Sequence, residues 1–380
     1  MRATLPVSEQ FWRDHWLWLK ERGYTLRPRY GPDWVPSWER DKRKRQCNCE
    51  DDVVPSSQHI LDARNSKGDL VALKRINLAT HPSEGVIARY FSSNNRKDNQ
   101  NNHCVPLLDV LHVPEDDKQD DTPIILVMPF LRSYKDPNFV TVGEAVDFLR
   151  QVIQGLHYMH HNRVAHRHVV SKNFMMDPKP LYLDMFHPMD PSKTYDFTHQ
   201  VKHRSRTAHP TKYYIVDLGD AREYSANSDK LCETALPREK SSAPEHHVPE
   251  QTPYDPFATD VYDLGDMFRS DFLDQSSSFE FLRPLISDMT KANASERPVM
   301  SEVDRRFEIL QRHLSADELR SRVTRRNESI FSSVCRGIRH LYRRMKLAGL
   351  QPVPTLPAPS SQIRNGFRPD HSDSLPSSPT

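Results

Sequence analysis

Glycine is scarce in this chain of 380 residues: only 11 occur, and no two of them lie within five residues of each other. Glycine-rich loops bind phosphates because a residue without a side chain lets backbone amides approach the anion closely. The spacing excludes a G-x-G-x-x-G loop anywhere in the chain. Any phosphate group that the protein binds must therefore lack this kind of lid.

The five cysteines are odd in number and mostly scattered, which is typical of a protein from a reducing compartment. Cys47 and Cys49 form a C-x-C without the second ligand pair of structural zinc sites, so zinc is not expected there. No run of about 18 apolar residues occurs, and no apolar segment follows a basic start at the N-terminus. These absences predict a soluble intracellular protein, cytoplasmic or nuclear, without a transmembrane segment.

An excess of one charge is also lacking, because 53 Lys and Arg residues face 51 Asp and Glu residues. No overall field then favours nucleic acid or an acidic substrate. A hydrophobic content of 36% with 30 prolines indicates a globular core with long loops. The Pro- and Ser-rich residues 351–380 predict a disordered tail.

All five tryptophans lie within the first 38 residues, so residues 1–54 form a Trp-rich N-terminal extension and linker. Ser8 is expected to cap a helix that runs to about Arg22, and Gly23 is placed to end it. Concentrated aromatic side chains favour packing on the following domain over a patch that binds a partner. The polar residues 39–58, with a basic run at 41–45, favour a solvated linker over a nuclear localisation signal.

Apolar spacing gives a coarse order of elements after the linker. It predicts strands at 59–63, 70–76, 104–113 and 123–131, a helix at about 82–92, and an amphipathic helix of about 20 residues from Thr141. The Pro-, His- and Asp-rich stretch 178–210 is expected to be a long inserted loop. Residues 313–350 are expected to form a basic amphipathic helical extension, either packed on the domain or facing an acidic partner or membrane surface.

Two segments carry the most specific pattern. The first contains His166, Arg167 and Asn173 at fixed spacing, and the second contains the triplet Asp217-Leu218-Gly219. Together they resemble the catalytic loop H-R-D-x-x-x-x-N and the metal-binding turn D-F-G of protein kinases. His168 stands where kinases carry the catalytic Asp.

Further motifs follow in the order found in kinases. Val71-Ala72-Leu73-Lys74 resembles the V-A-I-K strand, Glu84 stands near the place of the partner Glu, and Met128 lies in the hinge strand near the gatekeeper. The later matches are Ala243-Pro244-Glu245, the run from Asp260 to Gly265, and Arg297-Pro298. The resemblance covers roughly residues 55–312. It implies a two-lobed α+β protein-kinase-like fold, with a small β-rich N-lobe, a larger helical C-lobe and an ion pair between Glu245 and Arg297.

The resemblance also implies a partly retained site for ATP and Mg²⁺. Lys74 would hold phosphates, and Asn173 and Asp217 would supply oxygen ligands to the metal. His168 is the main departure, because a positioned acid or base is typically worth about 10²–10⁴ in rate. Lys172 retains a positive charge in the loop, whereas Val170 occupies the position of the usual Ser/Thr-kinase Lys.

These features favour a pseudokinase that retains part of the ATP site and acts by binding a protein partner. The alternative is a weak or atypical protein kinase that transfers the ATP γ-phosphate to a protein hydroxyl, with His168 or Asp220 in place of the loop Asp. A third reading is a kinase-fold scaffold that binds no nucleotide. None of the three involves nucleic acid.

Overall fold

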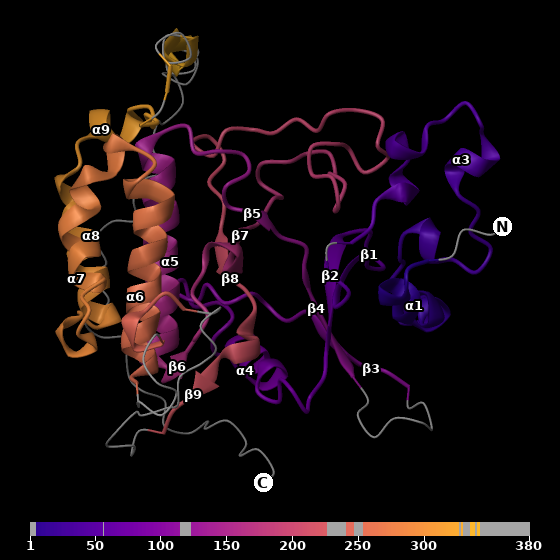
Figure 1. Ribbon diagram of the computed structural model, residues 1–380, viewed down its shortest axis with the longest axis horizontal. Helices are drawn as coiled ribbons and strands as arrows, with labels where there is room; N and C mark the ends of the chain where they lie inside the picture. Colours follow the sequence, from indigo (N-terminus) through magenta and orange to yellow (C-terminus); the bar gives the residue numbers. More distant parts are fainter. Residues whose placement is uncertain are drawn as a thin grey trace. The chain divides into compact units, whose positions relative to one another are not determined.

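The computed structural model describes residues 5–55, 57–114, 123–225, 241–246, 254–326, 328–329, 335–338 and 340–342. Helices and antiparallel strands occur in separate runs along the chain, which confirms an α+β protein (Figure 1). The chain divides into two compact units. Unit 1 comprises Met1–Pro82, Val105–Arg132 and Asp177–Arg204, and unit 2 comprises Ser83–Cys104, Ser133–Met176 and Ser205–Thr380.

Unit 1 is built on a four-stranded antiparallel sheet. Its strands are β1 (Ile60–Arg64), β2 (Leu70–Ile76), β3 (Asp109–His112) and β4 (Ile124–Pro129), in the order β1-β2-β4-β3. The tight turn between β1 and β2 uses Gly68 at φ 83°, a left-handed conformation that suits glycine. The predicted strands are therefore present, but the expected strand at 104–113 is confined to its second half.

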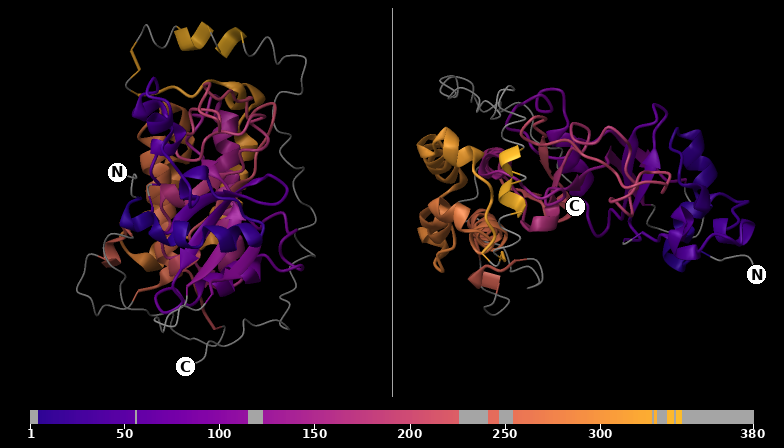
Figure 2. Two further views of the ribbon diagram at one scale, coloured as in Figure 1. Left: turned by 90° about the vertical axis from the view of Figure 1, so that its right-hand side faces the viewer. Right: turned by 90° about the horizontal axis from the view of Figure 1, so that it is seen from above.

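The N-terminal extension covers one face of this sheet. Its elements are α1 (Val7–Asp14), α2 (Trp16–Glu21), a 3-10 turn at Pro28–Tyr30 and α3 (Ser37–Arg40), and the left view of Figure 2 shows the helices in front of the strands. Trp12 is only 1% exposed and belongs to one hydrophobic core with Leu61 and Leu73. The expectation that the tryptophans pack on the following domain is confirmed for Trp12.

The predicted single helix from Ser8 to about Arg22 is wrong in two details. The first helix begins at Val7 after Pro6, so Ser8 lies inside the helix and does not cap it. The helix is then interrupted at His15, whose backbone leaves helical geometry and whose Nδ1 lies 2.8 Å from the carbonyl oxygen of Phe11. Gly23, at φ 88°, follows the end of α2 as expected.

The linker is only partly solvated. Short 3-10 turns form at Gln46–Asn48 and Glu50–Asp52, and Asp51 is buried. Its carboxylate accepts hydrogen bonds from the indole N–H of Trp34 and from the backbone and hydroxyl of Ser37. The prediction of a solvated linker is therefore wrong for this end of the segment, because its charges have partners inside unit 1.

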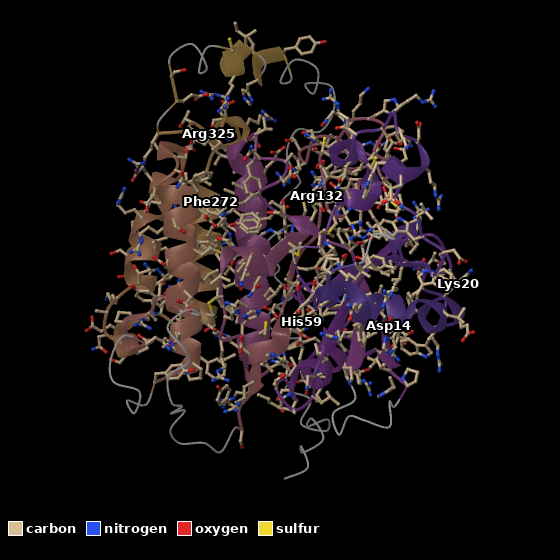
Figure 3. All side chains as sticks on the ribbon, turned by 45° about the vertical axis from the view of Figure 1, so that its right-hand side comes forward. Asp14, Lys20, His59, Arg132, Phe272 and Arg325 are labelled. Atoms are coloured by element: carbon tan, nitrogen blue, oxygen red, sulfur yellow. The ribbon has the colours of Figure 1, made fainter. Side chains whose placement is uncertain are left out.

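Unit 2 is mainly helical. Figure 1 shows its long helices running side by side: α5 (Val142–His161), α6 (Pro256–Phe268), α7 (Arg283–Met289) and α8 (Met300–His313), to which α4 (Glu84–Phe91) and α9 (Ala316–Arg320) are added. The predicted 20-residue helix from Thr141 is confirmed as α5, and the Thr141 hydroxyl accepts the N–H of Glu144. The ring of Phe148 packs against the ring of Phe272, which Figure 3 labels, with 5.8 Å between the ring centroids.

Short strands frame the loops of unit 2. β6 (Val164–Ala165) pairs with β9 (Arg222–Glu223), and β7 (Phe174–Met176) pairs with β8 (Tyr213–Ile215). The two-residue strand β5 (Arg132–Ser133) spans the boundary between the units in the sequence.

The structure describes every residue between Met176 and Tyr213 and forms no helix or strand there, which agrees with a long loop; that this loop is an insertion stays a prediction. Buried side chains such as Leu181, Phe186 and His187 fix it in place. Of the predicted helical extension 313–350, most of residues 328–350 lie outside the described residues, as do all of residues 351–380. Of the helices that the structure does describe, none combines the length and apolar character that crossing a membrane requires.

Candidate functional site

The loop between β6 and β7 carries the H-R-H motif, and a buried carboxylate on α6 fixes its backbone. Asp260 is fully buried and accepts the backbone N–H groups of His166 and Arg167, each at 2.7 Å. Its Oδ2 also lies 2.9 Å from Nε2 of His160. Hydrogen bonds to a carboxylate are stronger than those between neutral groups. They hold Arg167 at φ 65°, a conformation that is strained for a bulky side chain.

His166 connects this loop to the segment that precedes Asp217. Its Nε2 lies 3.1 Å from the carbonyl oxygen of Val216 and donates to it, and its Nδ1 accepts the backbone N–H of His168 at 3.3 Å. The two partners imply that the ring of His166 carries its proton on Nε2. The ring of His166 therefore fixes the spacing between the H-R-H loop and Asp217.

Asn173 ties the two segments together a second time. Its side-chain Nδ2 donates to the carbonyl oxygen of His168 at 2.9 Å, and its own carbonyl oxygen accepts the N–H of Val216 at 2.9 Å. Because the amide nitrogen makes the bond to His168, the amide oxygen is the atom that a cation can use. The predicted residues His168, Asn173 and Asp217 are thus brought together.

Asp217 occupies a special backbone position after β8. It adopts φ 63° and ψ 67°, in the left-handed region that Asp tolerates better than most residues. A 3-10 turn, Leu218–Asp220, follows directly. The carboxylate of Asp217 is 38% exposed, so a metal ion can reach it from solvent.

His168 faces the two aspartates of this turn. Its Nδ1 lies 3.6 Å from Oδ2 of Asp220 and 3.9 Å from Oδ2 of Asp217. Burial lowers the pKa of the imidazole; the charge of Asp217 opposes this, and the charges of His166 and Lys172 add to it. The net lowering favours a neutral ring at physiological pH. Lys172 itself is exposed on the loop.

Two predicted site residues lie in unit 1. Lys74 is half-buried on β2, between Ile60 of β1 and Leu126 of β4. Ala72, two residues before Lys74 on β2, pairs with Met128 of β4. Because side chains two residues apart on a strand point to the same side, Lys74 and Met128 project from the same face of the sheet. This is the face opposite the tryptophans. Lys74 also helps to lower the pKa of His59, after burial and the charge of Arg75.

Glu84 belongs to unit 2. It is the first residue of α4 and is only 3% exposed. α4 packs against the 3-10 turn that follows Asp217. The predicted site residues therefore divide into Lys74 and Met128 on the sheet of unit 1, and Glu84, His168, Lys172, Asn173 and Asp217 in unit 2.

The expected ion pair between Glu245 and Arg297 is confirmed. Two hydrogen bonds of 2.6 and 2.7 Å join the guanidinium to the carboxylate, and the Arg297 side chain is completely buried. Burial alone would raise the pKa of Glu245, but the hydrogen bonds from Arg297 and Thr259 lower it. The paired arrangement is what a buried guanidinium requires.

Sequence reasoning missed a second anchor of the loop. Asp271 accepts hydrogen bonds from the hydroxyls of Ser171 and Tyr134 and forms an ion pair with Lys135 at 2.6 Å. It lies in a π-helical turn, Arg269–Leu273, a type of distortion often found at functional sites. No local pattern in the sequence marks this residue, because its partners lie about a hundred residues or more away.

Among the residues that the structure describes, no three or more His, Cys, Asp or Glu side chains already stand together as a metal-binding group. The donor set of Asn173 and Asp217 nevertheless fits a hard divalent cation, since both offer oxygen atoms. No family model and no curated protein matches this chain.

Proposed function

We propose that the chain is a two-lobed protein-kinase-like protein that retains part of an ATP and Mg²⁺ site and acts chiefly through a protein partner. In this proposal unit 1 is the N-lobe with Lys74, and unit 2 is the C-lobe with Asn173 and Asp217. The antiparallel sheet around Lys74 and the helical character of unit 2 support the assignment.

One observation carries the proposal: the backbone of the H-R-H loop is held as a catalytic loop would need to be. Asp260 binds two successive backbone N–H groups, and His166 and Asn173 fix the loop to the strand before Asp217. This frame orients metal ligands even though His168 stands at the catalytic position. Such a frame has a clear use in binding a metal–nucleotide complex.

The substitution at position 168 explains why transfer is expected to be slight. In kinases the loop Asp accepts the proton of the substrate hydroxyl and positions it. The ring of His168 is buried and turned toward Asp217 and Asp220, so its Nδ1 faces these two carboxylates and is poorly placed to accept a proton from a substrate hydroxyl.

The phosphate lid of kinases has no glycine-rich counterpart here. In kinases a glycine-rich loop covers the phosphates and precedes the strand with the Lys. In this proposal the chain that joins Thr25 to β1 stands in its place, and Thr25 pairs with Arg64 of β1 through an isolated bridge. This segment holds the buried Arg27, which pairs with Asp62 and Glu50. We expect such an ion-paired segment to bind phosphates more weakly than a glycine-rich loop.

Nucleotide binding tests the proposal. We expect ATP with Mg²⁺ to raise the melting temperature of the full chain, and Lys74→Ala to reduce that shift strongly. Lys67→Ala is the matched control, because Lys67 is an exposed lysine in the turn before β2. A shift that is absent, or that Lys74→Ala and Asp217→Ala leave unchanged, would favour a scaffold that binds no nucleotide.

A weak protein kinase remains the second candidate, on the observation that Asp220 lies 3.6 Å from the His168 ring. In that case Asp220 would supply the base that the loop lacks. Phosphate incorporation that disappears in Asp220→Asn but survives in Asp288→Asn would support it.

A further inference from the structure

His168 presents a buried nitrogen atom that has no hydrogen bond. Its side chain is 10% exposed, and its Nδ1 has no hydrogen-bond partner within the described part of the chain. The separations of 3.6 Å to Asp220 and 3.9 Å to Asp217 are too long for hydrogen bonds. A buried polar atom of this kind requires an explanation, and an unseen ion is one of the few available.

The separations from His168 to the two carboxylates are close to the spacing that a metal ion imposes. Ligands about 2.0–2.2 Å from a metal stand about 2.8–3.6 Å apart at octahedral or tetrahedral angles. The separation of 3.6 Å to Asp220 lies at the upper end of this range, and that of 3.9 Å to Asp217 exceeds it by about 0.3 Å. The carboxylates of Asp217 and Asp220 are 38% and 17% exposed, so small rotations of these side chains can close the difference.

The protein fixes the backbone from which the imidazole projects. The backbone N–H of His168 donates to His166, and its carbonyl oxygen accepts from Asn173. The ring is therefore attached to a loop whose backbone is held on both sides of the peptide.

We propose that His168 is a nitrogen ligand to a divalent transition-metal ion, Mn²⁺ or Zn²⁺, which it shares with Asp217 and Asp220. Mg²⁺ prefers an all-oxygen shell, whereas an imidazole beside carboxylates suits Mn²⁺ and Zn²⁺. The inference rests on the proposed function in that Asp217 is the metal ligand in both. It adds that the replacement of the loop Asp changes which metal the site prefers.

The test uses the full chain without nucleotide, titrated with Mn²⁺ and followed by electron paramagnetic resonance. Pulsed spectra of bound Mn²⁺ should show coupling to an imidazole ¹⁴N nucleus, and Zn²⁺ should displace the Mn²⁺ signal. His168→Phe should abolish the coupling and weaken Mn²⁺ binding at least about tenfold, with a change in Mg²⁺ affinity below about threefold. His313→Phe is the matched control, since His313 is an exposed histidine at the end of α8.

Bound Mn²⁺ without nitrogen coupling in the wild-type chain would overturn the inference, as would equal Mn²⁺ affinity in His168→Phe. If His168→Phe does not fold, two measurements still test the inference. They are the nitrogen coupling in the wild-type spectrum and the Mn²⁺ affinity of Asp220→Asn, which is expected to be weaker. The result is independent of nucleotide. Nitrogen-coupled Mn²⁺ without ATP binding would retain the inference and reject the proposed function, whereas ATP binding without coupling would do the reverse.

Discussion

At the scale of single residues, buried charges decide most of the local structure. Asp260, Asp263 and Arg297 are all nearly or fully buried, and each is engaged in hydrogen bonds. The motif pattern predicted the partner of Arg297, because both residues belong to sequence motifs. It did not predict that Asp260 would bind the H-R-H backbone, since burial depends on distant segments.

The Glu245–Arg297 pair gives the first prediction. Arg297→Met should destabilise the protein by about 3–5 kcal/mol, because Glu245 would lose the partner that keeps its charge favourable in a mostly buried position. The control is Arg306→Met, whose pair with Asp288 is partly exposed and should be worth at most about 1 kcal/mol. Chemical denaturation measures both. Equal effects of the two substitutions would contradict the argument.

Asp263 gives the second. Burial, together with the charge of Asp260, raises its pKa to about 8, although hydrogen bonds from Ser241 and Ser242 oppose the shift. Between about pH 4 and 8 the folded chain then binds a proton that the unfolded chain has lost, so stability falls as pH rises, by up to about 1.4 kcal/mol per pH unit.

Asp263→Asn should remove that slope, and unfolding free energies measured from pH 5 to 8 test it. Asp288→Asn is the control, since the hydrogen bond from Arg306 lowers the pKa of Asp288 and keeps it ionised throughout this range. A slope that persists in Asp263→Asn would show that another group is responsible.

At the scale of elements, the spacing of apolar residues predicted the regular helices and strands but not the local features that depend on tertiary contacts. α5 follows directly from its apolar spacing and its Thr141 cap. The break at His15 and the burial of Asp51 could not be predicted from the apolar spacing. The burial of Asp51 depends on its hydrogen bonds with Trp34 and Ser37. The π-helical turn around Asp271 was equally invisible, since its partners are distant in sequence.

The N-terminal helices are predicted to be part of the folded core of unit 1. Trp12→Ala should cost about 3–5 kcal/mol, because it empties a position that is 1% exposed among Leu61, Leu73 and their neighbours. Leu17→Ala, at a site that is 59% exposed, should change stability by less than about 0.5 kcal/mol. Thermal unfolding of the two variants compares them. A similar small effect at both sites would mean that the extension does not stabilise the sheet.

At the scale of the whole molecule, the α+β class and the order of motifs could be predicted from the sequence. The turn that begins at Asp217, the H-R-H loop and Asn173 were predicted to meet, and they do within unit 2. The neighbours of the His168 ring could not be predicted from the sequence, because they depend on the direction in which the buried ring points. Asp220 was named from the sequence only as a possible base, and the structure adds that it lies 3.6 Å from that ring.

Transfer of labelled γ-phosphate from ATP, to the chain itself and to generic protein substrates, tests the central claim most directly. The wild-type chain should incorporate no more label than Lys74→Ala, while His168→Asp should incorporate clearly more, because it restores the base within an intact loop frame. Incorporation by the wild-type chain well above Lys74→Ala would contradict the account and identify an active kinase in which His168 is tolerated.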